Sequence, residues 1–206
     1  MRHIQFLFLM AFACFQPSLA QVGAVERWHL AGGLTSPAAP DQFYDYWKQG
    51  FQIMGGAEFS SQTRFLQLIT AEVNYFPFDQ ERFLKRLGID NGRTTISGSA
   101  AYILSLTYLI KYPFTEYSSF QPAFFAGLGC ASSIRSSATI EYPNYPVSQE
   151  TKSSVVAIVP FGVSIRVYER QRHVVEVNFT YTIGLSKSQT VNSNYSCLKL
   201  DYSFAP

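Results

Sequence analysis

The sequence predicts an all-β fold in which eight long antiparallel strands close into an up-and-down barrel. The first observation is the alternation over 172–185, where every odd position from Val175 to Leu185 is apolar. Successive side chains of a strand point to opposite faces, so this segment has one apolar and one polar face. The second observation is that the alternation recurs along the chain between connections that are long and short in turn. Antiparallel strands joined in this way form a meander.

The predicted strands are separated by proline, glycine and polar residues, which favour turns. They are 27–35, 51–60, 64–75, 97–112, 121–130, 153–168, 172–185 and 197–204. The long connections fall near 37–49, 76–96, 132–152 and 187–193, all at one end of the barrel. Within the second of them, Phe83, Leu84 and Leu87 have helical spacing and Gly88 is a suitable C-terminal stop, which predicts a short helix over 79–87.

The composition predicts that this barrel lies in a membrane. Charged residues make up 15% of the 206 residues, which is low for a water-facing surface, and aromatic residues make up 16%. A sheet in lipid must close on itself so that every backbone polar group has a partner. The apolar faces of the predicted strands carry no charged residue. The polar faces carry Arg27, Glu58, Arg64, Glu72, Lys111, Arg166, Glu176, Lys199 and Asp201. Because an eight-stranded barrel is narrow, we expect these charges to pair inside it, without a continuous pore.

The N-terminus has the features of a secretory signal. Residues 1–20 combine a basic start, an apolar core from Ile4 to Cys14 and a small-x-small site ending at Ala20, and residues 21–206 then form the barrel domain. The alternative is lipid attachment at Cys14, although Ala11-Phe12-Ala13 match a lipobox poorly.

The sequence indicates no catalytic, cofactor-binding or metal-binding residue. Cys130 and Cys197 are expected on opposite faces of the sheet, and no C-x-x-C spacing is present. Neither His29 nor His173 lies in an H-x-S pair, and the G-x-S-x-G nucleophile motif is absent. His29 falls on the polar face and is interpreted as a histidine of the lumen. With a formal charge of +2 and no basic cluster, nucleic acid is not an expected partner.

Several segments resemble a known family. They are G-F-Q-I-M-G-G-A-E-F-S-S-Q-T-R-F-L-Q-L-I-T-A-E-V-N-Y (50–75), Y-I-L-S-L-T-Y-L-I-K-Y (102–112), P-A-F-F-A-G-L-G (122–129) and V-E-V-N-F-T-Y-T-I-G-L (175–185). This pattern resembles the bacterial outer-membrane β-barrel domain often called the porin family. Ser105 and Thr107 depart from it, since the family usually has Glu and Pro there.

The resemblance implies an integral protein of the cell outer membrane, surrounded by lipid and lipopolysaccharide. It implies insertion by the barrel assembly machinery, which recognises a final strand ending in an aromatic residue, here Phe204, although Ala205 and Pro206 follow it. We expect a monomer with a structural or surface-interaction role and no enzymatic activity.

Two other functions remain open at this stage. One is a soluble periplasmic lipocalin-like barrel that binds a small apolar ligand inside, and the other is an outer-membrane enzyme that modifies lipids. For the surface role, the aromatic residues of the first loop (Phe43, Tyr44, Tyr46 and Trp47) are candidate contacts, as is the third loop, which is rich in Ser, Tyr and Pro.

Overall fold

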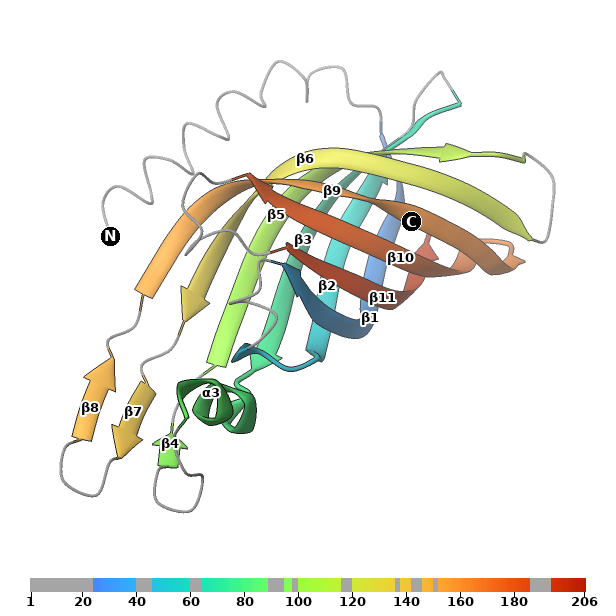
Figure 1. The fold of residues 1–206 in the computed structure, drawn as a ribbon. Coiled ribbons are helices and arrows are strands. Elements are labelled where there is room, and N and C mark those ends of the chain that lie inside the picture. Colours follow the sequence, from blue (N-terminus) through green and yellow to red (C-terminus); the bar gives the residue numbers. More distant parts are fainter. Residues whose placement is uncertain are drawn as a thin grey trace.

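The computed structural model describes residues 24–39, 46–59, 64–88, 95–97, 100–115, 120–135, 138–141, 146–149, 152–185 and 194–206. Within them, eight strands form a closed barrel in the order β1-β11-β10-β9-β6-β5-β3-β2 (Figure 1). They are β1 (Val25–Ala39), β2 (Gly50–Phe59), β3 (Leu66–Pro77), β5 (Ala100–Pro113), β6 (Gln121–Arg135), β9 (Lys152–Arg170), β10 (His173–Leu185) and β11 (Asn194–Phe204). The predicted eight-stranded barrel is confirmed. The predicted signal sequence lies outside the described residues.

Each barrel strand pairs antiparallel with its neighbours in the meander, and β1 pairs with β11 to close the barrel, with Trp28 opposite Phe204. The predicted alternation of long and short connections is confirmed. We call the end with the connections 60–65, 114–120 and 171–172 the turn end, and it also holds the last residues of the chain. The opposite end, which we call the loop end, has the connections 40–49, 78–99, 136–151 and 186–193.

The loop end carries a short helix, as predicted. Helix α3 (Gln80–Leu87) begins after Asp79, whose side chain accepts a hydrogen bond of 3.1 Å from the backbone N–H of Arg82. It ends at Gly88, which has a left-handed φ of 68° and donates its N–H to the last carbonyls. Among the described residues, no helix has the length and apolar character needed to cross a membrane.

Part of the loop end differs from the prediction. The segments expected to be plain loops contain β4 (Thr95–Ser97), β7 (Ala138–Glu141) and β8 (Pro146–Gln149), which form a small sheet in the order β4-β7-β8. In addition, β6 and β9 extend beyond the predicted limits into the polar segment 132–152. A barrel strand that leaves the bilayer has both faces in water, so its backbone pairing continues although the apolar alternation stops. Figure 1 shows these strands beyond the loop end of the barrel.

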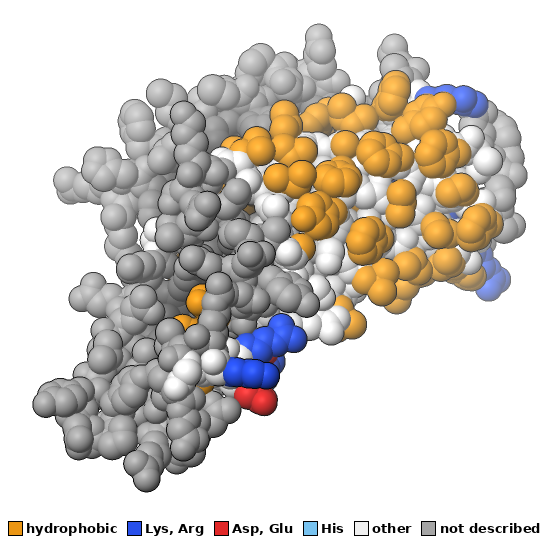
Figure 2. Space-filling view, in the orientation of Figure 1, with side chains coloured by type: hydrophobic (Ala, Val, Ile, Leu, Met, Phe, Trp, Pro, Cys, Tyr) orange, Lys and Arg blue, Asp and Glu red, His pale blue; other side chains and the backbone are white. Residues whose placement is uncertain are grey.

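The two faces of the strands are those that the alternation predicts. Along β10, burial alternates at every residue, and Glu176, Asn178 and Thr180 are buried while Phe179 is exposed. Large apolar side chains cover the outer face all around the barrel. They include Leu30, Ile53, Ile110, Leu128, Val163, Phe179, Leu198 and Leu200. Figure 2 shows this apolar band on one side, with basic side chains beyond both of its ends.

Two local irregularities adapt the sheet to its interior. In β9, Val175 of β10 lies opposite Tyr168 and Glu176 opposite Arg166, so Val167 is an extra residue of a β-bulge. Because of the bulge, the consecutive residues Val167 and Tyr168 are both exposed on the outer face. At Gly162, a Cβ atom would lie 2.8 Å from Cζ of Phe125. The missing side chain leaves room for this aromatic ring inside the barrel.

Candidate functional site in the barrel interior

A layer of charged side chains fills the half of the interior nearer the turn end. Lys111 Nζ donates a hydrogen bond to Glu176 Oε2, and Lys199 Nζ donates one to Glu72 Oε1 at 2.9 Å. Arg166 Nε lies 3.7 Å from Glu176 Oε1, so Glu176 has a cation on two sides. All four members of the two lysine pairs are buried. Buried charges are tolerated when they are paired in this way, because each would otherwise be left without solvation.

His29 connects two carboxylates of different strands in the same layer. Its Nδ1 lies 3.1 Å from Asp201 Oδ2, and its Nε2 lies 3.4 Å from Glu58 Oε2. Asn178 Nδ2 also donates to Asp201 Oδ2 at 3.2 Å. Only a doubly protonated imidazole has an N–H on each nitrogen, and in that form His29 neutralises part of the charge of the two acids. The parity of the first strand predicts an inward His29, and the structure confirms it.

A second group of charges lies at the turn end of this layer. Glu169 accepts a hydrogen bond of 2.9 Å from Arg166 Nη1, and its Oε1 lies 3.7 Å from Arg27 Nη2. The Glu169 side chain is 40% exposed, in contrast to the deeper acids. The charge layer therefore reaches water at the turn end and is buried further inside.

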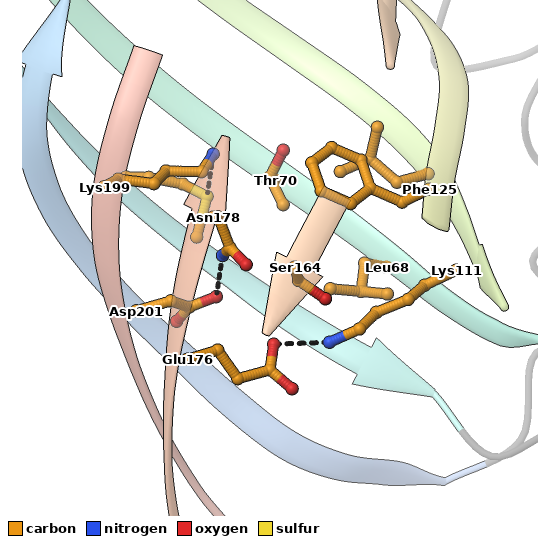
Figure 3. Close-up of a pocket in the computed structure, with 11 residues that line it drawn as sticks. Leu68, Thr70, Lys111, Phe125, Ser164, Glu176, Asn178, Lys199 and Asp201 are labelled. Carbon is orange, nitrogen blue, oxygen red and sulfur yellow. Dashed lines mark hydrogen bonds and ion pairs between the residues drawn. The ribbon is translucent and has the colours of Figure 1, made fainter. Parts of the chain in front are cut away.

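A cavity of about 20 Å³ lies in the middle of the charge layer (Figure 3). Figure 3 shows the paired side chains of Lys111 and Glu176 and of Asn178 and Asp201 along its wall, with Ser164 between the two pairs. Its apolar side is formed by the buried cluster of Leu68, Leu109 and Phe125. A space of this size and polarity suits about one water molecule, which needs roughly 10–15 Å³.

The half of the interior nearer the loop end contains an apolar cluster, with buried polar side chains such as Gln52 and Asn74 beside it. Its cluster consists of Trp47, Phe76, Ala101, Ile103, Ala131, Val156, Ile158, Tyr195 and Cys197. The rings of Phe76 and Tyr195 lie 6.0 Å apart across the lumen, and both are almost completely buried. The alternation of the strands places Phe76 and Tyr195 on inward positions. The apolar cluster that they form was not predicted, because a polar interior was expected.

Helix α3 covers this apolar cluster. Phe83 contacts Tyr46 and Phe78 at ring distances of 5.2 and 5.3 Å, and these two residues pack against the cluster. The ring of Phe78 also lies 5.5 Å from that of Trp47. Leu84 on the same helix is completely buried. Helix α3 therefore packs over the apolar cluster at the loop end.

The structure corrects two predictions about individual residues. Arg64 was expected inside the barrel, but it precedes β3 in the turn and is exposed, because the strand begins only at Leu66. Trp47 was a candidate surface contact, but it is buried in the loop-end cluster. Tyr46 is half-buried for the same reason, and Phe43 and Tyr44 lie outside the described residues.

The remaining candidates for chemistry are also placed. Cys197 is buried in the lumen and Cys130 is half-buried on the outer face, so they face opposite sides as predicted and are free. His173 is exposed at the turn end, where its Nδ1 lies 2.6 Å from the Tyr202 hydroxyl. No group of three or more potential metal ligands is found in the part of the chain that the structure describes.

Known structures share this fold. Neisserial surface protein A aligns with a TM-score of 0.51 and 14% sequence identity, covering 87% of this chain and 97% of that chain. Ail, the attachment invasion locus protein of Yersinia pestis, aligns with a TM-score of 0.49 and 13% identity over 88% and 100% of the two chains. The outer-membrane enzyme PagL aligns with a TM-score of 0.47 and 16% sequence identity, covering 87% of this chain and 99% of that chain. No family model and no curated protein sequence matches the chain.

The chain has the fold of the small eight-stranded β-barrels of the bacterial outer membrane. Its apolar side chains face outward and its charges face inward, which is the arrangement required in a bilayer and the reverse of a soluble barrel with an apolar ligand site. The lipocalin-like alternative is therefore wrong. The fold and the apolar outer face together assign the protein to the cell outer membrane.

Proposed function

We propose that this protein is a sealed outer-membrane barrel that acts through its external surface, in a structural or surface-interaction role, and neither conducts solutes nor catalyses a reaction. The observation that supports this proposal is the filled interior. The turn-end half holds hydrogen-bonded ion pairs around a cavity of about 20 Å³, and the loop-end half holds the apolar cluster beneath α3. A porin instead leaves a water-filled channel, which needs a wider barrel of roughly 16–18 strands.

The proposed orientation places the loop end outside the cell and the turn end in the periplasm. Barrels of this kind have short periplasmic turns and longer external loops. Aromatic side chains mark the turn-end boundary of the apolar band, and they include Trp28, Tyr112, Tyr168, Tyr202 and Phe204. Such aromatic girdles lie at the level of the lipid headgroups.

The loop end offers an ordered surface for external contacts. It combines α3 with the three-stranded sheet β4-β7-β8. Lys48, Arg82 and Lys85 are exposed beside the helix, and Asp79 Oδ1 lies 3.7 Å from Lys48 Nζ while its Oδ2 lies 3.3 Å from Arg82 Nε. The basic residues at the base of this surface suit the phosphate groups of lipopolysaccharide in the outer leaflet. We also propose that the barrel assembly machinery inserts the protein and that the protein is a monomer. We propose no cofactor and no nucleic-acid partner.

The non-enzymatic role rests on where the two described histidines lie. His29 is buried between Glu58 and Asp201, out of reach of a lipid substrate. His173 stacks on Tyr202 with a ring distance of 5.8 Å, at the end opposite to lipopolysaccharide in the proposed orientation. A general base must be within hydrogen-bond reach of its substrate, and the burial of His29 prevents this for any lipid, while the position of His173 prevents it for lipopolysaccharide.

Two experiments test this function. In planar bilayers, the purified protein should give no stable current steps, and regular steps at low voltage would refute the sealed lumen. On intact cells, trypsin should cleave at Arg82 or Lys85 on α3 and spare Arg170 and Arg172 at the turn end. The opposite cleavage pattern would refute the proposed orientation, and a protein found only in the periplasmic fraction would refute the membrane location.

A further inference from the structure

The outer surface of the barrel has an apolar groove across β5 and β6 near the turn end. Its volume is about 350 Å³, and it is lined by Phe65, Ile110, Tyr112, Phe124, Ala126, Gly127 and Leu128. Ala126 forms the floor, because it stands between Phe124 and Leu128 on the outer face of β6 and opposite Ile110 of β5. Three larger side chains therefore rise around one methyl group. The volume is within the range of ligand sites, roughly 300–1,000 Å³.

The groove runs along the strands from the membrane boundary towards the bilayer centre. The strand register places Tyr112 opposite Phe124 at one end and Tyr108 opposite Leu128 at the other. The four residue steps from Tyr108 to Tyr112 in β5 span about 13 Å at 3.3–3.4 Å per residue. Tyr112 belongs to the aromatic girdle of the turn end, so the opposite end of the groove lies deeper in the hydrocarbon layer.

An arginine lies at the boundary end of the groove. The rings of Phe65 and Tyr112 are 5.4 Å apart, and Arg64 Nη1 lies 3.5 Å from Tyr112 Oη. Arg64 is exposed. Among the residues that line the groove, none is acidic. The site thus combines an apolar channel in the hydrocarbon layer with a guanidinium at the headgroup level.

We propose that this groove binds a phospholipid of the periplasmic leaflet, with one acyl chain over Ala126 and the phosphate beside Arg64. A guanidinium recognises phosphate oxygens through charge-assisted hydrogen bonds. The inference rests on the proposed orientation, since only there does the turn end meet the periplasmic leaflet. A second copy of the chain suits the groove less well. A twofold contact through it would bring two Arg64 side chains together without an acid from the groove between them.

Native mass spectrometry of the full-length protein in detergent tests the site. The probes are dioleoylphosphatidylglycerol and dioleoylglycerol, which has the same acyl chains and no phosphate. We expect the wild type to retain one phosphatidylglycerol about fivefold more tightly than dioleoylglycerol, as a partly exposed charge contact of about 1 kcal/mol implies. Arg64→Gln should abolish this preference and leave the acyl binding unchanged. Ala126→Phe should fill the groove and weaken both lipids at least tenfold.

Matched substitutions separate the groove from general effects on the surface. Ala71→Phe adds the same ring at an outward, exposed position of β3, and Arg170→Gln removes an exposed arginine at the same end; both should behave like the wild type. A heat-dependent shift in gel mobility establishes that each variant is folded, and Ala126→Leu replaces Ala126→Phe should the latter not fold.

Three results would overturn the proposal. One is equal lipid retention in the Ala126 and Ala71 variants, and another is a phosphate preference that survives in Arg64→Gln. The third is a mass of two copies that Ala126→Phe reduces to one, which would make the groove a dimer interface. Failure of this inference leaves the sealed barrel intact, because that function is judged by membrane fractionation and conductance.

Discussion

Neutralising Glu72 is the most direct test of a dry, sealed interior. The side chains of Lys199 and Glu72 are 3% and 9% exposed, and Lys199 Nζ donates to Glu72 Oε1 at 2.9 Å. Lys199 Nζ also lies 3.3 Å from the sulfur of Met54, which carries no charge, and Asp201 is another acid whose charge acts on it. Glu72→Gln therefore leaves a buried ammonium without its hydrogen-bonded counter-ion. Breaking a buried pair in this way costs about 3–5 kcal/mol, which lowers the folding equilibrium constant at least about 100-fold.

Reversible unfolding in urea measures this change in the free energy of unfolding. The protein is folded into detergent micelles, and the folded fraction is followed by tryptophan fluorescence and by the heat-dependent gel shift. The double variant Glu72→Gln with Lys199→Met removes both charges, so we expect it to be within about 1–2 kcal/mol of the wild type. The matched control is Glu169→Gln at the turn end, where the side chain is 40% exposed and the expected cost is below about 1 kcal/mol.

A water-filled lumen would give a different result. Water would screen the pair, and Glu72→Gln would then cost no more than Glu169→Gln. In that case the interior is hydrated and the proposed absence of a pore is wrong. A double variant as unstable as the single one would show instead that packing, not charge, makes Glu72 important.

Three further experiments test other parts of the molecule. Phe179→Arg places a charge on the lipid face of β10, where the side chain is 48% exposed, and should cost about 2–4 kcal/mol of unfolding free energy in the same assay. Tyr168→Arg in the aromatic girdle should cost only about 0–1 kcal/mol. Equal costs would contradict the depths assigned to the two residues in the bilayer. Asp79→Ala removes the N-cap of α3 and should destabilise the helix by about 1 kcal/mol. The expected result is faster proteolysis at Lys85, while the heat-dependent gel shift of the barrel is unchanged. An unchanged rate of proteolysis would contradict the capping role. Trp47→Ala opens the apolar cluster at the loop end and should lower the free energy of unfolding by about 3–5 kcal/mol. The variant should still give no conductance, because the charge layer stays closed. Current steps would show that the apolar cluster alone seals the lumen.

The barrel could be predicted from the sequence because alternation is a local signal. Each strand has to satisfy lipid on one side and a narrow lumen on the other, so the pattern survives along β10 without any knowledge of its neighbours. The inward position of Lys199, Glu176 and His29 follows from the same parity. Their partners could not be predicted, since pairing depends on the stagger between strands. Glu72 and Lys199 lie on β3 and β11, which are not adjacent in the barrel.

The rest of the interior was missed for a physical reason. Leu68, Leu109 and Phe125 occupy inward positions, although a polar interior was expected. A narrow lumen has to be filled at close to the packing density of a protein core, and apolar side chains do this without requiring partners. The bulge at Val167 and the small sheet β4-β7-β8 depend on backbone pairing that leaves no apolar period in the sequence.

The buried charges matter more for the register of the strands than for net stability. A buried ion pair is worth little compared with apolar residues of equal volume, because desolvation offsets the attraction. A slip of one residue in β11, however, would turn Lys199 and Asp201 into the lipid and bring Leu198 and Leu200 inside. A lysine at the centre of the bilayer alone costs about 2–4 kcal/mol. We infer that the charge layer penalises misaligned closure of β1 on β11, the first and last of the described barrel strands. Removing both charges of a pair should therefore slow closure or allow several registers, while the folded state stays stable.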